Sequence, residues 1–503
     1  MNTKNAIAAA STAAVTAAYH WPVLGFHFVR YDDDIMLQTL AARPHGLAAT
    51  LRWALTTTQA GTYQPVGWIV DAALDAAQHG AVPFGHHAVV LALHATAAAL
   101  LCLVAARLLD LARPGGRHHA AAAAFGALLF AMHPLQAQAV AWASAKGDLL
   151  AACFLLGATL AYLRPERTGR ALAVAWALAI LSGLCRWKGA CFLPLAMLLD
   201  VYPLRRLPAS PLAWGEPEAR RTILEKIPLL LIAALVVAAN AIAKRQAYGY
   251  AMSPRPMDAA TVLLFFAAKW IGPMNLLPVY SFAGAANPMG WAPAAATAGV
   301  AGLTAGFVVL RRTAPALLVA WAFAVASLLP VCLLAAPGQP VYTHDFHAYF
   351  AGLGVAVAAA AGLAIALERS RLALLAMAMP LLIGTAARRE ARPWHDTTAL
   401  WEHAWGIDPS SRDFVARYGR ALQEGGHFGD ALMVYMAQEE SDPAAARANA
   451  GAAWVKMART HAAAGRLKEA ADALRQAERA GQGDAAVQEA VRRERRALRA
   501  ATK

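Results

Sequence analysis

Residues 87–109 read HAVVLALHATAAALLCLVAARLL, a run with one arginine and no acidic residue. About 20 consecutive apolar residues in a helix are enough to cross the ~30 Å hydrocarbon core of a bilayer. Similar runs recur along most of the chain, of whose 503 residues 59% are hydrophobic and only 15% are charged. Soluble domains carry about 25% charged residues. The composition therefore predicts an all-α, multi-spanning membrane protein.

Lysine and arginine residues orient the predicted spans, because both are enriched in cytoplasmic loops. We attribute the net charge of +14 to such loops and expect no nucleic-acid partner. Lys4 precedes the first run, which we interpret as an uncleaved span because Tyr19-His20-Trp21-Pro22 is a poor signal-peptide cleavage site. The count is about 11 spans: residues 6–25, 87–109, 119–132, 149–163, 171–187, 190–203, 227–243, 292–310, 314–335, 347–367 and 371–387.

The apolar stretch 258–280 is the exception, because Lys269, Pro273 and Pro278 interrupt it. A full span here would place Arg311 and Arg312 outside, against the charge rule. We therefore expect this stretch to lie along the outer interface or to re-enter the membrane.

The composition changes to that of a soluble domain from residue 388 onward. Asp408-Pro409 and Asp442-Pro443 are 34 residues apart, and residues 465–470 echo residues 426–431. A 34-residue period with small residues at fixed positions is typical of tetratricopeptide repeats. The expected domains are a transmembrane domain over 1–387, with an outer loop over 30–85 that carries interfacial helices, and a periplasmic helical repeat domain over 388–503.

Polar residues gather at the span ends on the predicted outer side, and they mix acids with bases. The triplet Asp32–Asp34, taken alone, reads as a solvated loop start, and Lys146 or Lys269 alone as a snorkelling side chain. A water-filled outer cavity explains the whole set better. Its expected members are Asp32, Asp33, Asp34, His86, His87, His133, Gln136, Gln138, Lys146, Asp148, Arg186, Lys188, Lys269, Asp345 and His347.

Such a cavity supports a limited chemistry. A carboxylate at the membrane surface can act as general base on an acceptor hydroxyl. Arginine and lysine can hold a phosphate leaving group and neutralise its developing charge. This combination suits glycosyl transfer from a polyprenyl-phosphate sugar whose lipid tail stays in the bilayer. Three adjacent aspartates could also ligate Mg²⁺ or Mn²⁺, the only cofactor that the sequence suggests.

Several short motifs follow one another in a characteristic order: Arg30-Tyr31-Asp32-Asp33-Asp34, Tyr63-Gln64-Pro65, His133-Pro134-Leu135, Lys146-Gly147-Asp148, Leu199-Asp200-Val201-Tyr202-Pro203-Leu204-Arg205-Arg206, Glu225-Lys226 and Trp394-His395-Asp396. In order and spacing the chain resembles GT-C glycosyltransferases with tetratricopeptide repeats. This group includes bacterial membrane proteins and the eukaryotic transmembrane and tetratricopeptide repeat-containing O-mannosyltransferases.

The resemblance implies a GT-C-like fold in the bacterial inner membrane and an inverting hexosyl transfer on its outer face. Asp32 and Asp33 match the family's acidic pair, the base and the acceptor contact, which would also be the metal site if there is one. The repeats would recruit a protein or glycan acceptor. The remaining implied substrate contacts are Asp34, His133, Gln138, Lys146, Asp148, Arg186, Lys188, Asp345 and His347, with Arg186, Lys188 and Lys146 as the phosphate contacts.

Two positions depart from the family pattern. Gln138 stands where a glutamate is usual, and Phe346 where an arginine is usual. These departures support an alternative hypothesis, a catalytically degenerate, membrane-anchored scaffold whose repeats bind protein partners. A transporter is less well supported, because the ionisable residues lie at span ends on one side rather than at mid-membrane.

Overall fold

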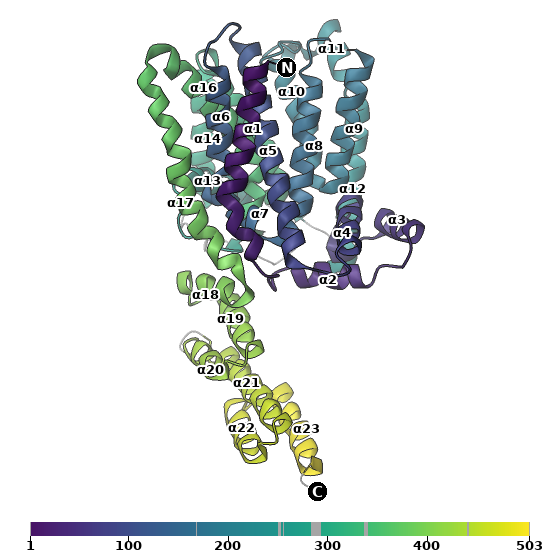
Figure 1. Cartoon of the computed structure of the whole chain (residues 1–503), viewed down its shortest axis with the longest axis vertical. Helices are drawn as coiled ribbons and strands as arrows, with labels where there is room; N and C mark the ends of the chain where they lie inside the picture. Colours follow the sequence, from purple (N-terminus) through teal and green to yellow (C-terminus); the bar gives the residue numbers. More distant parts are fainter. Residues whose placement is uncertain are drawn as a thin grey trace. The chain divides into compact units, whose positions relative to one another are not determined.

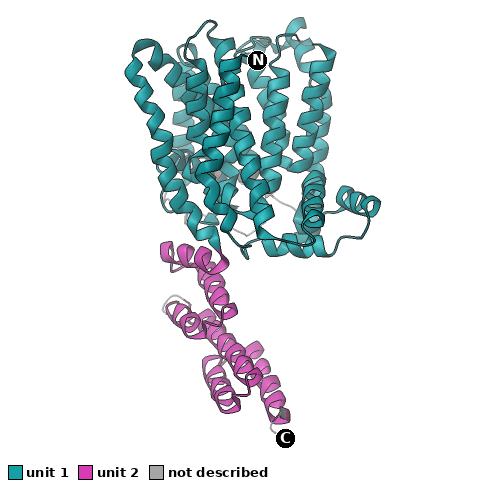
Figure 2. Cartoon of the chain, viewed as in Figure 1, with its two compact units in different colours: residues 1–395 teal, residues 396–503 magenta. Residues whose placement is uncertain are grey.

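The computed structural model describes residues 2–166, 168–249, 253–254, 256–282, 293–335, 341–439 and 442–501. The chain forms two compact units, residues 1–395 (unit 1) and 396–503 (unit 2), drawn in two colours in Figure 2. Each unit is a separate body with its own core.

Unit 1 is a helical bundle with a few short strands (Figure 1). Its α-helices are α1 (Thr3–His20), α2 (Asp33–Ala41), α3 (Leu47–Thr56), α4 (Pro65–Ala77), α5 (Pro83–Ala112), α6 (His119–Ala131), α7 (Ala137–Ala141), α8 (Lys146–Tyr162), α9 (Gly169–Cys185), α10 (Phe192–Val201), α11 (Pro217–Leu224), α12 (Ile227–Tyr248), α13 (Pro256–Ile271), α14 (Pro293–Val309), α15 (Pro315–Leu333), α16 (Ala348–Arg369) and α17 (Met379–Ala391).

Short 3-10 helices and strands connect these helices. The 3-10 helices are η1 (Trp21–Gly25), η2 (Gln59–Gly61), η3 (Pro134–Gln136), η4 (Ala143–Ala145), η5 (Trp187–Cys191), η6 (Pro211–Gly215), η7 (Leu310–Arg312), η8 (Asp345–His347), η9 (Arg371–Ala378) and η10 (Arg392–His395). The strands are β1 (Ser253–Pro254), β2 (Tyr280–Phe282), β3 (Leu334–Ala335) and β4 (Val341–Thr343).

Six helical segments in the described part of the chain are long and apolar enough to cross a membrane, which makes unit 1 a membrane domain. The bent pair of α6 with η3 and α7 would add a seventh, with a bend of 59°. Helices α1, α9, α10 and α15 occupy further predicted span ranges without passing this test, so the total of about 11 stays a prediction. The six segments are Pro83–Ala112, Ala143–Tyr162, Ile227–Tyr248, Pro293–Arg312, Asp345–Arg369 and Arg371–His395.

The two ends of unit 1 differ in charge. One end, near the N-terminus in Figure 1, carries the loops with most of the arginines, and we call it the arginine-rich end. At the opposite end lie α2, α3 and α4, and we call it the aspartate end. The loop arginines at the arginine-rich end are Arg113, Arg117, Arg164, Arg205, Arg206, Arg220, Arg221, Arg311, Arg312, Arg369 and Arg371.

The stretch from β1 to β2 begins and ends at the same end of unit 1. Strand β1 pairs with β3, and β2 pairs with β4, both antiparallel. Both partners belong to the connection from α15 to α16. Between β1 and β2, α13 buries Val262, Phe265 and Phe266 in a core shared with α15 and α16. The interfacial or re-entrant placement in a membrane stays a prediction, and we name residues 258–280 the re-entrant stretch after it.

Unit 2 is entirely helical in the residues that the structure describes, and neighbouring helices pack in pairs. Helices α19 and α20 approach each other closely at Gly419, where an added Cβ would lie 2.3 Å from the Tyr435 ring of α20. The tetratricopeptide assignment stays a prediction, and the unit boundary at 395 falls beyond the expected 387 because α17 continues to Ala391. The helices are α18 (Thr397–Ile407), α19 (Arg412–Glu424), α20 (Phe428–Met436), α21 (Pro443–Ala463), α22 (Leu467–Ala480) and α23 (Ala485–Ala501).

Small residues let the helices of unit 1 approach one another closely. A Cβ added at Gly126 in α6 would lie 2.3 Å from the Ala356 carbonyl oxygen of α16. A Cβ at Gly354 in α16 would lie 2.9 Å from the Ala320 carbonyl oxygen of α15. Such close contacts between small residues replace the hydrophobic driving force that membrane helices lack.

We expect Gly126→Ala to destabilise the protein by about 1–3 kcal/mol, because the new methyl group meets backbone and forces α6 from α16. Gly302→Ala in α14 is the matched control, since no atom lies within 4 Å of its added Cβ. The thermal midpoint of the detergent-purified chain, followed by tryptophan fluorescence, should fall for Gly126→Ala only. Equal midpoints would contradict this close contact.

Candidate active site

Asp33 is the first residue of α2 and is fully buried at the aspartate end. Its Oδ2 accepts a hydrogen bond from the Val29 amide at 2.9 Å. Its Oδ1 accepts bonds from the Ser144 amide at 3.0 Å and the Ser144 hydroxyl at 2.5 Å. Burial raises the pKa of Asp33, and the bonds from Ser144 and Val29 counteract this effect. Asp33 therefore fastens α2 to η4, and both its oxygens are engaged.

The other two predicted acids differ from Asp33 in exposure. Asp32 is exposed and Asp34 is half-buried. Asp32 occupies the N-cap position of α2, but its side chain does not cap the helix. Of the triplet, Asp32 is thus the carboxylate most accessible to a substrate in water.

Lys146 begins α8 and is buried beside the acidic motif. Its Nζ forms an ion pair with Asp71 at 3.0 Å and donates to His86 Nδ1 at 2.9 Å and the Ala143 carbonyl at 2.6 Å. It also lies 3.6 Å from Met36 Sδ in α2. Lys146 thereby connects α2, α4 and α5 to the start of α8.

Asp71 was not among the predicted site residues. Burial raises the pKa of its carboxyl group, and the charge of Lys146 counteracts that effect. The sequence did carry a signal: Asp71 lies three residues after Trp68, on the face of α4 that is otherwise apolar and buried. An acid on the apolar face of an amphipathic helix requires a buried partner.

Asp148 lies in the first turn of α8 and is fully buried between two cations. Lys188 Nζ lies 2.7 Å from its Oδ1, and Arg186 Nε lies 2.9 Å from its Oδ2. Arg186 also donates to Gln64 in the loop before α4. Two cations and one carboxylate leave one net positive charge at this point.

Lys188 is the more buried of the two cations. Burial lowers its pKa to about 8, although Asp148 opposes the shift. Its ammonium group also lies 4.3 Å from the centroid of the Phe346 ring, within the range of a cation–π contact. Phe346, one of the two departures from the family pattern, thus faces a cation supplied by η5.

Gln138 and His133 hold the re-entrant stretch in place. Gln138 donates from Nε2 to the Pro278 carbonyl at 3.1 Å and accepts at Oε1 from the Phe346 amide at 3.1 Å. His133 Nε2 donates to the Trp270 carbonyl at 3.2 Å, and the two rings lie 4.2 Å apart. A glutamate carboxylate at 138 could not donate to Pro278, so the amide performs a task that the usual acid could not.

The remaining predicted residues lie in or beside η8. Asp345 Oδ2 accepts a bond from the Tyr280 hydroxyl at 3.2 Å, and the charges of Lys269 and Glu390 act on Asp345. A hydrogen bond of 3.1 Å joins His347 Nδ1 to the Thr343 hydroxyl. Asp345 therefore faces the re-entrant stretch, whereas its neighbour Phe346 faces Lys188.

Tyr31 organises an aromatic group that the sequence did not reveal. Its ring packs edge-on against Trp142, Trp394 and His344, with centroids 5.3–5.9 Å apart. Its hydroxyl donates to the Pro278 carbonyl at 3.0 Å. Tyr31 thus joins three segments of unit 1: the start of the acidic motif, the re-entrant stretch and the end of the unit.

Asp33 is the buried member of the acidic triplet, and its oxygens are engaged by protein donors. Both Asp33 oxygens already accept hydrogen bonds, and no group of three or more His, Cys, Asp or Glu among the described residues is arranged to hold a metal. The predicted Mg²⁺ or Mn²⁺ stays a prediction, and no step proposed below passes through a metal.

No protein-family model and no curated protein matches this chain. Two solved structures of an Archaeoglobus fulgidus oligosaccharyltransferase are partly similar at 15% identity, one tethered to an acceptor peptide and the other, named AglB, in complex with an inhibitory peptide and a dolichol-phosphate. The TM-scores are 0.38 and 0.40, and the match covers 84% of this chain but 58% and 59% of those chains. This chain thus spans under two thirds of their length, and a likeness this low decides neither fold nor function.

We expect Asp148→Asn to cost about 3–5 kcal/mol of stability, because it leaves Lys188 and Arg186 buried without a counter-charge. Asp34→Asn is the control, because Asp34 is a half-buried acid of α2 at the same end of unit 1. Thermal midpoints in detergent test the difference. The double variant Asp148→Leu with Lys188→Met should recover part of the loss, and a midpoint for Asp148→Asn equal to that of the control would refute the pairing.

Proposed function

We propose that the chain is a GT-C-type glycosyltransferase that moves a sugar from a polyprenyl-phosphate donor to a protein or glycan acceptor. The observation that carries this proposal is the convergence at the aspartate end. Asp33 and Met36, which follow the exposed Asp32 in α2, contact Ser144 and the buried Lys146 at the start of α8. In the first turn of the same helix, Asp148 forms a group with Arg186 and Lys188.

Asp32 is the proposed general base. It removes the proton from the acceptor hydroxyl as the acceptor oxygen attacks the anomeric carbon. The bond from that carbon to the phosphate oxygen breaks, and the electron pair leaves with the phosphate. One displacement inverts the configuration of the anomeric carbon. Asp33 is a positioning residue in this scheme, because its hydrogen bonds to Val29 and Ser144 set the start of α2.

Arg186 and Lys188 are the proposed phosphate contacts. Asp148 neutralises only one of the two charges, so the group keeps an attraction for an anion. Arg186 is the more accessible member, with a side chain 14% exposed against 2% for Lys188. A guanidinium group can also donate to Asp148, Gln64 and a phosphate at the same time.

The arginine-rich end is the proposed cytoplasmic side, because arginine-rich loops stay there. The aspartate end then faces the periplasm of an inner membrane. Unit 1 ends at this side, since the His395 carbonyl accepts a bond at 2.9 Å from the His27 amide shortly before Asp32. Unit 2 is proposed to be a tetratricopeptide-like acceptor-recruiting domain in the periplasm.

The alternative, a degenerate scaffold, rested on Gln138 and Phe346. Both residues have contacts that do not require a loss of catalysis: Gln138 joins the re-entrant stretch to η8, and Phe346 packs under Lys188. These contacts favour the transferase. Failure of the purified chain to bind a polyprenyl-phosphate sugar at millimolar concentration would favour the scaffold instead.

We expect Asp32→Asn to reduce glycan transfer by roughly 10²–10⁴-fold, the usual contribution of a general base. Glycopeptide mass spectrometry of a deletion strain that expresses either wild type or variant measures the effect. Asp75→Asn in α4 is the matched control, because this half-buried acid pairs with Arg43 and lies outside the predicted site, and it should keep most of the activity. Undiminished transfer by folded Asp32→Asn protein would exclude the proposed role of this residue.

Donor binding should weaken as the pH rises through about 8, because Lys188, with its pKa near 8, loses its proton there. The charge is present below this pH and absent above it. Titration calorimetry with polyprenyl-phosphate mannose, a phosphodiester that does not titrate in this range, measures the effect from pH 7 to 9.5. Lys188→Arg should bind with little pH dependence over this range, since guanidinium keeps its charge. The same pH dependence in both proteins would contradict a phosphate contact by Lys188.

A further inference from the structure

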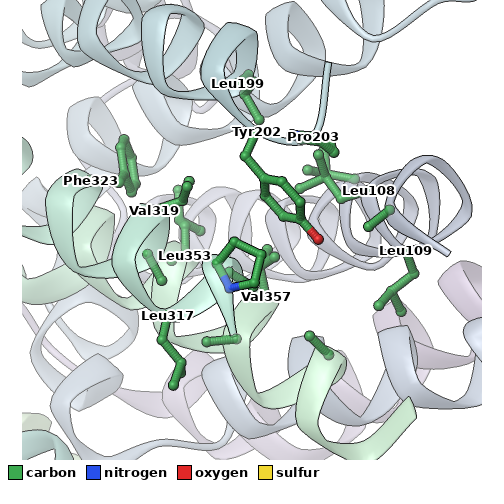
Figure 3. Close-up of a pocket in the computed structure, with 18 of the residues that line it drawn as sticks. Leu108, Leu109, Leu199, Tyr202, Pro203, Leu317, Val319, Phe323, Leu353 and Val357 are labelled. Atoms are coloured by element: carbon green, nitrogen blue, oxygen red, sulfur yellow. The ribbon is translucent and has the colours of Figure 1, made fainter. Parts of the chain in front are cut away.

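A cavity of about 260 Å³ lies between α5, α8, α10, α15 and α16 (Figure 3). Its lining is mostly apolar, and leucine, alanine and valine are the commonest residues. The threonine hydroxyls in the lining are used locally: Thr159 donates to the Leu155 carbonyl at 2.8 Å and Thr313 to the Leu310 carbonyl at 3.2 Å. The polar groups left to a ligand are those of Tyr202 and Arg113.

Tyr202 directs its side chain into this cavity, as Figure 3 shows. The tyrosine is half-buried, and its hydroxyl has no hydrogen-bond partner among the described residues. A phenol in an apolar wall normally finds a partner. A ligand with an acceptor atom near the cavity mouth would supply one.

Arg113 follows α5 at the arginine-rich end and contributes the cationic part of the lining. It forms an ion pair with Glu368 at 2.9 Å, but both side chains are nearly half exposed, at 45% and 46%. Exposed pairs of this kind are weak. The guanidinium group has five N–H donors, so it can bind an anion while it stays near Glu368.

The surrounding helices decide what kind of ligand fits. Helices α5, α8 and α16 belong to candidate membrane spans, so the apolar part of the cavity lies within hydrocarbon. Basic pockets between membrane helices on the cytoplasmic side bind anionic lipid headgroups. We propose that the cavity holds one acyl chain of an anionic glycerophospholipid, whose phosphate is bound by Arg113 and the Tyr202 hydroxyl.

This lipid is distinct from the sugar donor. In α5, His86 contacts Lys146 at the aspartate end, whereas Leu109 lines the cavity. The 23 residues between them span roughly 35 Å of helix. A donor phosphate beside Asp32 cannot also reach Arg113, so this proposal does not depend on the transferase activity.

Native mass spectrometry of the full chain, delipidated in detergent and then mixed with phosphatidylglycerol or phosphatidylcholine, tests the proposal. We expect one retained phosphatidylglycerol, at least fivefold preferred over phosphatidylcholine. Gly362→Phe should reduce retention at least fivefold, because Gly362 lines the cavity and its Cβ has open space around it. Gly302→Phe is the matched control outside the cavity, also with open space, and should retain lipid like wild type.

Arg113→Gln provides a second variant at an exposed position, where folding is not at risk. It should retain the lipid but lose the preference for phosphatidylglycerol. The proposal is overturned if wild type shows no such preference, if folded Gly362→Phe retains lipid like wild type, or if polyprenyl phosphate displaces phosphatidylglycerol from the Arg113 site.

Discussion

A wholly buried carboxylate, Asp148, fixes the arrangement of the aspartate end. A lone charge in that position would be very costly, so Arg186 and Lys188 must both remain against it. Their positions hold η5 against the start of α8. From there Arg186 reaches Gln64 in the loop before α4, and Lys188 reaches Phe346 in η8. This loop, α8, η5 and η8 therefore converge because one acid requires two partners.

A second buried aspartate, Asp200, plays a comparable part at the arginine-rich end. It accepts from the Tyr162 hydroxyl at 2.7 Å and pairs with Arg206 at 3.0 Å and Lys226 at 2.6 Å. Glu225 also pairs with Arg206, at 2.5 Å, so two acids balance two cations there. At Asp148 only one carboxylate contacts the two cations, because the neighbouring acid Asp71 is paired with Lys146, so one positive charge of the group remains. This difference explains why a phosphate site is expected at the aspartate end and a structural anchor at the other.

Local patterns in the sequence were sufficient to find the membrane helices and the end of unit 1 whose loops are rich in arginine. They also selected polar residues that lie at the aspartate end, because span ends and loop charges determine which end a residue occupies. Local patterns could not predict that Asp33 is buried and hydrogen-bonded while Asp32 is exposed. This difference depends on Ser144, which lies 111 residues from Asp33 in the chain. For the same reason, the sequence alone suggested that Gln138 replaces a functional acid. Its hydrogen-bond partners Pro278 and Phe346 lie in distant segments, so the role of the amide was not visible in local patterns.

Photo-crosslinking with a polyprenyl phosphate that carries a diazirine beside the phosphate would show where the donor phosphate binds. We expect labelled peptides from η5 and the start of α8, around Lys188 and Asp148, with competition by unlabelled donor. Labelling there should fall in Lys188→Met protein that remains folded. Competable labelling confined to peptides around Asp200 and Arg206 would place the phosphate at the arginine-rich end and exclude a phosphate site beside Asp148.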